Sequence, residues 1–318
     1  MTDLPLFRVE QPGLLSTVQD GGRPGFQALG VPVGGAMDAW ASAVANLLLG
    51  NSPGDATLEI TLTGPHLSVL REASVAICGA DLAPTLEGVP VPLWHTFPVR
   101  PGQTLRFGQR RAGARAYLAA AGGLAVPPVL GSRGTFLRGG WGGCGGRALR
   151  PGDILRAYAA PLAPARGLRP VDIPRYPPDV RLRLVPGPHE ALFDLEALRA
   201  FYAAPYTLTP QSDRMGYRLD GPGGQARLGG AATLPSEAVP MGAVQAPPGG
   251  PPLLLMADRQ TTGGYPLLGV VISADLPRAA QLAPGNTVRF VPVSVEEAQR
   301  EGQPSRAFLR LLAWACAR

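Results

Sequence analysis

Hydrophobic and polar residues alternate over several short segments of the chain, which is the pattern of β-strands with one buried face. In residues 57–62 (TLEITL), the hydrophobic side chains of Leu58, Ile60 and Leu62 share one face, and the polar side chains share the other. This segment predicts a half-buried strand, and residues 180–185 (VRLRLV) alternate in the same way. Further short strands are expected at residues 74–78, 89–93, 104–107, 115–120, 252–257 and 268–273.

Helical periodicity is confined to a few segments. Asp38 can act as an N-cap, Gly50 suits a helix end, and hydrophobic residues at helical spacing lie between them: Trp40, Val44, Leu47 and Leu48. A second helix is predicted near residues 189–203, with one face formed by Leu192, Leu195 and Leu198. A third helix is expected over residues 304–316, and Ser294 with Glu297 forms a capping-box pattern before it.

Three similar stretches suggest that the two halves of the chain are related. They are PGQTLRF (101–107), PGDILR (151–156) and PGNTVRF (284–290), and each reads as a Pro-Gly turn that enters a strand. Between the halves, residues 160–179 contain six prolines and no periodic hydrophobic pattern. This predicts a linker or an extended crossing. We therefore expect an N-terminal β-barrel subdomain (1–165) and a C-terminal β-barrel subdomain (166–318), in a fold that is mainly β (α+β) with a few short helices.

Composition narrows the possible chemistry. The 42 glycines and 36 prolines interrupt short hydrophobic runs, as in a loop-rich β protein. The net charge is +6, and all 29 basic residues are arginines. The absence of lysine excludes a Gly-Lys-Ser/Thr phosphate loop, a lysine Schiff base and a biotinyl-lysine. The arginines are dispersed rather than interleaved with aromatic residues, so nucleic-acid binding is not expected, whereas acidic small substrates or an acidic protein partner stay open.

The cysteines and histidines do not form a recognisable site. Three distant cysteines, an odd number, argue against a disulfide framework: Cys78, Cys144 and Cys316. The three histidines show no metal-binding spacing, so no protein-ligated metal is expected: His66, His95 and His189. The N-terminus lacks the features of a signal peptide, and no hydrophobic run approaches ~20 residues. These features predict a cytoplasmic protein without a membrane span.

Four polar clusters are candidates for a functional site, although each could also be a solvated turn. The first, residues 16–38, supplies Gln19, Asp20, Arg23 and Asp38 among glycines, which let a backbone approach a ligand closely. The others are GSRGT (131–135) with Arg133, QSDRMGYRLDG (211–221) with Asp213, Arg214 and Arg218, and ADRQTTGGYP (257–266). The last follows SEAVPMGAVQAP (236–247), which contains Glu237 and Gln245.

These residue types favour binding of an anionic or amide ligand. Arginine binds planar carboxylates through two parallel hydrogen bonds, and a buried aspartate beside it would hold it in place. Glutamine and threonine can donate to developing negative charge, as in an oxyanion hole. No Ser–His or Cys–His nucleophile pattern is recognisable. Covalent catalysis is therefore not predicted.

Together, the clusters resemble the allophanate hydrolase subunit 2 or KipA family, whose members are also known as the C subunit of 5-oxoprolinase. They also resemble half of the carboxyltransferase domain of urea carboxylase. The matching stretches are GLLSTVQDGGRPGFQALGVPVGGAMD, ANLLLGN, LEITLTGP, GGLAVPPVLGSRGTF, SDRMGYRLDG, LPSEAVPMGAVQAPPGG and ADRQTTGGYP. The resemblance implies two cyclophilin-like β-barrel subdomains. Gly34 and Gly134 depart from the family, which has serine in the SGAMD and GSRST motifs at these positions.

The family implies three functions. The first is ATP-dependent cleavage of 5-oxo-L-proline to L-glutamate with A and B subunits. The second is carboxyl transfer from carboxybiotin to urea or a related amide, and the third is KipA-type antagonism of a histidine-kinase inhibitor. We favour the first, because we expect the chain to be free-standing and because, without lysine, it cannot carry biotin itself. We expect it to be inactive alone and to require A-like and B-like (KipI-type) subunits.

The resemblance and the polarity of the loops together predict the site residues. Those expected to be catalytic are Asp258, Arg259, Gln260, Thr261 and Asp38. Those expected to bind substrate are Arg23, Arg214, Gln245, Glu237, Tyr265 and Arg133. Two or three converging arginines would fit the 5-oxoproline carboxylate, and Gln260 or Thr261 could meet the ring oxygen. ATP is expected to be bound by, or shared with, the partner subunits, and no metal, nucleic acid or membrane partner is expected.

Overall fold

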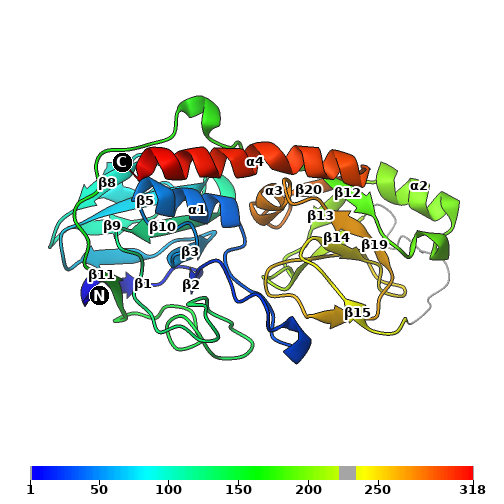
Figure 1. Cartoon of the computed structure of the whole chain (residues 1–318), viewed down its shortest axis with the longest axis horizontal. Helices are drawn as coiled ribbons and strands as arrows, with labels where there is room; N and C mark the ends of the chain where they lie inside the picture. The colour runs from blue at the N-terminus through cyan, green and yellow to red at the C-terminus, as the bar shows by residue number, and fades with distance from the viewer. Residues whose placement is uncertain (1, 222–233, 318) are drawn as a thin grey trace. The chain divides into compact units, whose positions relative to one another are not determined.

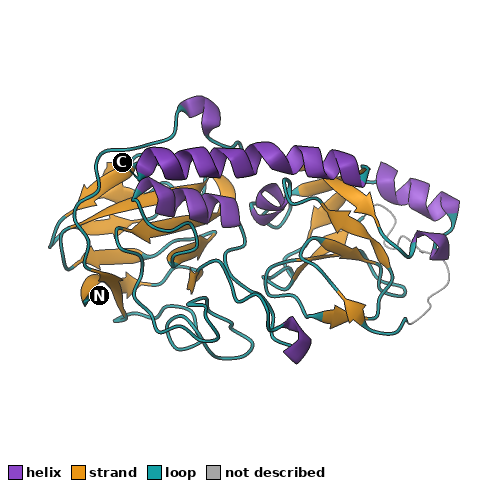
Figure 2. Cartoon of the chain, in the orientation of Figure 1, coloured by secondary structure: helices purple, strands orange, loops and turns teal. Residues whose placement is uncertain are grey.

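The computed structural model describes residues 2–221 and 234–317, and β-strands account for most of its regular structure (Figures 1 and 2). The chain forms two compact units. The first contains Met1–Arg23, Gly34–Tyr176 and Ala307–Arg318, and the second contains Pro24–Val33 and Pro177–Arg306. The predicted fold class, mainly β with barrel subdomains and few helices, is confirmed. The subdomain boundary between residues 165 and 166 stays a prediction.

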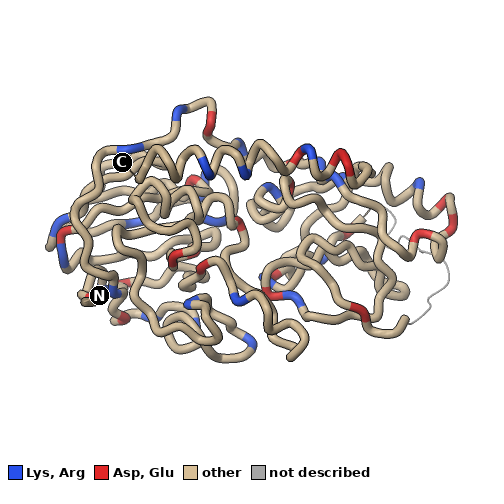
Figure 3. Tube along the Cα trace, viewed as in Figure 1, with Lys and Arg blue, Asp and Glu red and all other residues tan. Residues whose placement is uncertain are grey.

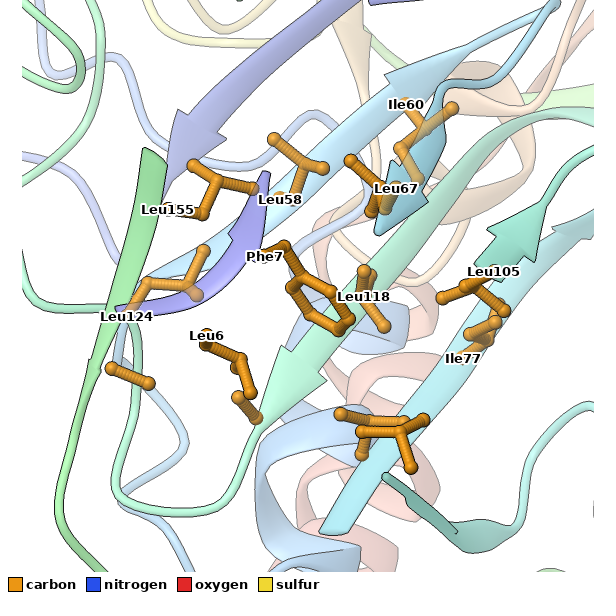
Figure 4. Packing of buried hydrophobic residues seen from close by; sticks show 14 of the residues in the cluster. Leu6, Phe7, Leu58, Ile60, Leu67, Ile77, Leu105, Leu118, Leu124 and Leu155 are labelled. Atoms are coloured by element: carbon orange, nitrogen blue, oxygen red, sulfur yellow. The ribbon is translucent and has the colours of Figure 1, made fainter. Parts of the chain in front are cut away.

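The first unit consists of two antiparallel sheets. A six-stranded sheet has the order β11-β1-β4-β9-β6-β7, and a five-stranded sheet has the order β2-β3-β10-β5-β8. The strands are β1 (Asp3–Gln11), β2 (Leu15–Gln19), β3 (Thr57–Thr61), β4 (His66–Val69), β5 (Ala73–Asp81), β6 (Thr85–Leu86), β7 (Val89–Pro90), β8 (Thr96–Val99), β9 (Thr104–Arg106), β10 (Ala112–Ala120) and β11 (Ile154–Tyr158). Both sheets contribute to one hydrophobic core, in which Phe7, Leu58, Leu67 and Leu118 pack together (Figure 4).

Helix α1 (Ala39–Leu48) covers the five-stranded sheet. Its buried side chains, including Val44 and Leu48, form a second core with residues of β5 and β10. The expectation that residues 57–62 form a half-buried strand is therefore wrong, because all residues of β3 are buried. One face meets the sheet core, and on the other the Thr57 Oγ1 lies 3.0 Å from the Ser42 Oγ of α1.

The second unit is built around a closed barrel with the order β12-β19-β16-β17-β14-β13-β20. Its strands are β12 (Asp179–Pro186), β13 (Tyr206–Leu208), β14 (Gly216–Asp220), β16 (Ala243–Gln245), β17 (Leu253–Leu255), β19 (Leu267–Val271) and β20 (Thr287–Pro292). Strands β12 and β20 pair in parallel, and the other neighbours are antiparallel. A separate two-stranded ribbon joins β15 (Glu237–Ala238) to β18 (Thr262–Gly263).

The helices depart from the predictions in two places. The segment near 189–203 divides into η3 (Glu190–Leu192) and α2 (Leu195–Ala203), and Leu192 and Leu195 are exposed, because the buried side of α2 is formed by Leu198 and Phe201. The C-terminal helix α4 (Val295–Cys316) begins nine residues before the predicted start at 304. The capping box starts it, since Ser294 and Glu297 exchange hydrogen bonds of 2.9 and 3.2 Å. The remaining helices are α3 (Leu276–Ala280), η1 (Gln27–Leu29) and η2 (Pro170–Asp172).

The three Pro-Gly turns are confirmed as entries to strands β9, β11 and β20. Their glycines, Gly102, Gly152 and Gly285, have φ of 87°, 85° and 88°, a conformation that suits glycine. The proline-rich segment after β11 packs on the first unit: the Thr96 Oγ1 donates to the Pro164 carbonyl at 2.9 Å, and Leu168 is buried. Among residues 2–221 and 234–317, no helix combines the length and hydrophobicity needed to cross a bilayer. The cytoplasmic location stays a prediction.

Candidate functional site

The loop 257–266 forms part of a cavity of about 290 Å³ in the second unit. Three segments line this cavity: Gln27, Pro32 and Val33; Ala238, Val239 and Pro240; and Arg259, Gln260 and Thr261. The β15–β18 ribbon connects the last two segments, and the Val239 N–H extends it by donating to the Thr261 carbonyl at 3.1 Å. Small-molecule sites commonly have this form, a concave and mostly apolar wall with a few polar groups.

Two of the predicted site residues, Arg214 and Asp258, form a buried ion pair. The Arg214 Nε and Nη2 each donate to an Asp258 carboxylate oxygen at 2.9 Å. Both side chains are about 95% buried, and the Asp258 N–H donates to the Arg214 carbonyl at 2.8 Å. A paired, hydrogen-bonded geometry is what allows two charges to be buried in a protein. The pair therefore anchors the start of the loop that lines the cavity.

Arg259 lines this cavity, and within the described residues its hydrogen bonds go to backbone carbonyls. Its Nε donates to the Val239 carbonyl at 2.9 Å, and its Nη1 to the Met256 carbonyl at 3.4 Å. Partial burial lowers the pKa of the Arg259 guanidinium, because a charge removed from water is disfavoured. Among the described residues, Arg259 forms no ion pair.

Three further predicted residues are linked around the loop. The Gln260 Nε2 lies 3.5 Å from the Gln245 Oε1, and the Gln245 Nε2 lies 3.5 Å from the Tyr265 carbonyl. Gln245 is almost fully buried, whereas the Tyr265 side chain is about half exposed. The buried Gln245 side chain thus holds the Gln260 amide in place. Tyr265 contributes its backbone carbonyl, rather than its ring, to this network.

The sequence did not single out His189, which pairs with Glu237 beside a second, smaller hollow. The His189 Nε2 lies 3.3 Å from the Glu237 Oε1, and the Leu267 N–H donates to the His189 Nδ1 at 3.1 Å. Because Nδ1 accepts that hydrogen bond, the neutral ring carries its hydrogen on Nε2 and donates it to Glu237. Of these two residues, the sequence indicated Glu237 alone, because Glu237 lies in the segment 236–247 that precedes the polar loop.

In the first unit, Asp20 organises the glycine-rich segment and the GSRGT loop. Its Oδ1 accepts from the Ser132 Oγ at 2.6 Å and from the Gly22 N–H at 2.8 Å, and its Oδ2 accepts from the Arg133 N–H at 2.6 Å. The bonds from Ser132 and Arg133 join segments that are more than a hundred residues apart in sequence. The Arg133 side chain donates to the Tyr158 hydroxyl at 3.3 Å.

Arg23 is almost fully buried in the first unit. Its Nη2 donates to the Gly134 carbonyl, and its guanidinium lies 4.4 Å from the centre of the Trp141 ring. Stacking of this kind stabilises a desolvated arginine. Arg23 therefore ties the same two loops together, and its predicted role in substrate binding stays a prediction.

Gly134, where the family has serine, faces three oxygen atoms. A Cβ at this position would lie 3.1 Å from the Asp20 Oδ1 and the Gln19 Oε1, and 3.2 Å from the Ser132 Oγ. Gln19 is fully buried, and its Oε1 has no hydrogen-bond partner among the described residues. A serine hydroxyl would supply a donor beside an acceptor that lacks one.

We expect Gly134→Ser to be more stable than Gly134→Ala by about 1 kcal/mol, the net value of one hydrogen bond. Both variants introduce the same crowded Cβ, so their difference in free energy of unfolding isolates the hydroxyl. Chemical denaturation of the two proteins measures it. Equal stability, or a more stable alanine variant, would show that the hydroxyl finds no partner here.

Gly34, the second departure from the family, has a backbone conformation that suits glycine. Its φ is 64°, in the left-handed region, where a residue with a side chain costs about 1–2 kcal/mol. Glycine removes that cost, while the neighbouring Gly35 leaves no room for any side chain.

Asp38 caps helix α1 inside the first unit. Its Oδ1 accepts from the Ala41 N–H at 2.9 Å, and its own N–H donates to the Tyr117 hydroxyl at 2.7 Å. Tyr117 in turn donates to the Glu59 Oε2 at 2.9 Å, and burial, followed by the charges of Glu59 and Asp38, raises the Tyr117 pKa well above its usual value. Asp38 has no exposed surface. Its contacts are those of an interior network, and its catalytic assignment stays a prediction.

The predicted residues thus divide between the units. The second unit contains Asp258, Arg259, Gln260, Thr261, Arg214, Gln245, Glu237 and Tyr265, and the first contains Arg23, Arg133 and Asp38. Gln27 and Pro32 were missed as cavity residues, although both lie in the glycine-rich cluster 16–38 that the sequence indicated. In the described parts of the chain, no cluster of three His, Cys, Asp or Glu residues is placed to hold a metal ion. Charged residues are dispersed along both units (Figure 3).

Comparison with protein families gives a match over residues 29–292, most of the chain, to the carboxyltransferase domain, subdomain A and B. The chain belongs to this family. It is 37% identical over 311 residues to the 5-oxoprolinase C subunit of Escherichia coli K12, covering 97% of this chain and 98% of that protein. It is 36% identical to the 5-oxoprolinase C subunit of Haemophilus influenzae, covering 92% and 93%. The resemblance inferred from the polar clusters is confirmed.

Family members also occur within much longer chains. The urea amidolyase of Lachancea kluyveri is 33% identical over 96% of this chain, which spans 18% of that protein. The solved urea amidolyase of K. lactis is similar in fold, with a TM-score of 0.85 at 31% identity, over 98% of this chain and 20% of that one. The crystal structure of TTHA0988 has a TM-score of 0.82 at 40% identity, and this chain spans 55% of it.

Proposed function

We propose that this chain is the C subunit of an ATP-dependent 5-oxoprolinase, which opens 5-oxo-L-proline to L-glutamate together with A and B subunits. The observation that carries the proposal is the end-to-end alignment with the C subunit of a 5-oxoprolinase, over 97% of this chain and 98% of the relative. The urea amidolyases, in contrast, are matched over about a fifth of their length.

The cavity in the second unit supports the same proposal. Its volume of about 290 Å³ suits a small ligand, and Gln27 and Thr261 contribute amide and hydroxyl groups beside an apolar wall. When a lactam carbonyl is activated, negative charge gathers on its oxygen, and donors of this kind stabilise that charge. The chain contains no lysine and so no lysine-containing phosphate loop, which supports placing ATP binding on a partner subunit or a shared surface.

The second candidate is carboxyl transfer from carboxybiotin to urea or a related amide. It is favoured by the fold similarity to the K. lactis urea amidolyase over 98% of this chain. Both candidates act on an amide or ureido group, so the amide and hydroxyl groups of the cavity do not separate them. They differ in biotin, which only the second requires.

A reconstitution experiment separates the candidates. We expect a mixture of this chain with its A-like and B-like subunits to hydrolyse ATP only when 5-oxo-L-proline is present, and to be unaffected by avidin. The chain alone should hydrolyse no ATP. Inhibition by avidin would support carboxyl transfer instead. Absence of substrate-dependent turnover, together with tight binding to the B-like subunit, would support the regulatory alternative.

A further inference from the structure

Arg259 is a partly buried cation whose charge is not neutralised by any carboxylate of the described residues. Two of its three nitrogens, Nε and Nη1, donate to the carbonyls of Val239 and Met256. Its Nη2 makes no hydrogen bond within residues 2–221 and 234–317. Partial burial of a charge costs free energy unless a partner of opposite charge compensates it, and the lowered pKa of Arg259 reflects that cost.

Three other arginines that are at least partly shielded from solvent pair with carboxylates. Arg214 pairs with Asp258 at 2.9 Å, and Arg183 pairs with Asp275 at 2.7 Å. Arg147 pairs with Asp153 at 2.7 Å. Against this background, an arginine that lines a cavity without such a partner indicates that the partner is the ligand.

The groups beside Arg259 restrict the ligand further. Pro32, Val33 and Pro240 give the cavity an apolar wall. The Gln27 Oε1 already accepts from the Gly25 N–H at 2.7 Å, so its Nε2 is the group left to donate. The Gln260 Nε2 is directed to Gln245, so its Oε1 is the group left to accept. One donor and one acceptor match the two sides of a planar amide.

We propose that Arg259 binds the carboxylate of a small cyclic amide in this cavity and thereby makes the site selective for an anionic lactam. The ligand class is a lactam ring with an adjacent carboxylate, as in 5-oxo-L-proline. The carboxylate meets the free edge of the guanidinium, the methylene groups of the ring meet the prolines and Val33, and the amide lies between Gln27 and Gln260. Of the two arginines of this unit among the predicted site residues, Arg214 is paired with Asp258, which leaves Arg259 for this contact.

This inference rests on the proposed function and extends it to selectivity. Urea is neutral and has no carboxylate to offer Arg259. A site in which this arginine is partly dehydrated therefore favours an anionic amide over a neutral one of similar size, since the unpaired charge stays uncompensated when the neutral molecule binds.

The test compares two ligands and three variants by titration calorimetry, with the full chain alone and with its A-like and B-like subunits. The ligands are 5-oxo-L-proline and its neutral amide, 5-oxo-L-prolinamide. The variants are Arg259→Gln, Arg259→Lys and the matched control Arg181→Gln, which removes an exposed arginine from β12 of the same unit. Thermal melting of each variant verifies that it is folded.

We expect the wild-type protein to bind the carboxylate ligand about tenfold or more tightly than the neutral amide, the value of a charged hydrogen-bonded contact. Arg259→Gln should abolish that preference while leaving the affinity for the neutral amide within about twofold, a pattern that loss of stability alone would not produce. Arg259→Lys should retain part of the preference, because it keeps the charge and loses the planar fork. Arg181→Gln should behave as the wild type.

A preference that survives in folded Arg259→Gln overturns the inference, as does the absence of any preference in the wild-type protein both alone and with its partners. In either case ATP turnover that still depends on 5-oxo-L-proline would leave the proposed function standing. Charge-selective binding without turnover in the complete mixture would overturn the proposed function and leave the binding site standing.

Discussion

Replacing Asp258 with alanine is expected to lower the free energy of unfolding by about 3–5 kcal/mol, because it removes the carboxylate that pairs with the buried charge of Arg214. The guanidinium is only 4% exposed, and both of its hydrogen bonds to the carboxylate, at 2.9 Å, are lost. Water cannot replace them without opening the junction between β14 and the loop after β17. Denaturation by urea, monitored by circular dichroism, measures the change.

Two controls separate the uncompensated charge from other effects of Asp258→Ala. In the double variant Arg214→Met with Asp258→Leu, both charges are replaced by hydrophobic side chains, and much of the loss should be recovered. Asp3→Ala removes a carboxylate from the exposed pair with Arg156 and should leave the transition unchanged. If Asp258→Ala unfolds at the same urea concentration as the wild-type protein, the ion pair does not hold the loop.

Gly35→Ala is expected to destabilise the protein by about 3 kcal/mol or more, through strain and a steric clash together. The φ of Gly35 is 82°, and a Cβ there would lie 2.7 Å from the Gly22 nitrogen and 2.8 Å from the Asp20 carbonyl oxygen. Both atoms belong to the backbone, so neither can rotate away. The variant should therefore disturb the contacts that Asp20 makes with the GSRGT loop.

Gly30→Ala is the matched control for Gly35→Ala. Its φ is 78°, almost the same, but a Cβ there would meet no atom within 4 Å. The control should cost only about 1–2 kcal/mol, the value of the left-handed conformation for a residue with a side chain. If thermal or chemical denaturation gives the two variants equal stability, the close approach of Gly35 to the backbone is not a constraint.

Features that depend on neighbouring residues could be predicted from the sequence. Asp38 caps α1 as expected, because an N-cap needs only a side-chain oxygen and an N–H three residues later. Asp213 likewise caps a turn, since its Oδ1 accepts from the N–H groups of Met215 and Gly216. The Pro-Gly turns were also predictable from adjacent residues, and all three lead into strands.

Features that depend on distant residues could not be predicted in the same way. The partner of Arg214 is Asp258, forty-four residues away, and not the adjacent Asp213. The alternation in residues 57–62 indicated one buried face, but α1 covers the other. Segment 24–33 forms a wall of the cavity in the second unit, although it lies between two segments of the first. Periodicity contains no information about such contacts, so the cavity itself had to come from the structure.

The central claim is that this chain is a required component of an enzyme that opens 5-oxo-L-proline. The most direct measurement follows carbon-13-labelled 5-oxo-L-proline by NMR in a mixture of the chain, its A-like and B-like subunits and ATP. The account predicts that labelled glutamate accumulates in the complete mixture and not when this chain or ATP is omitted. Unchanged 5-oxo-L-proline in the complete mixture, or glutamate formed at the same rate without this chain, would contradict it.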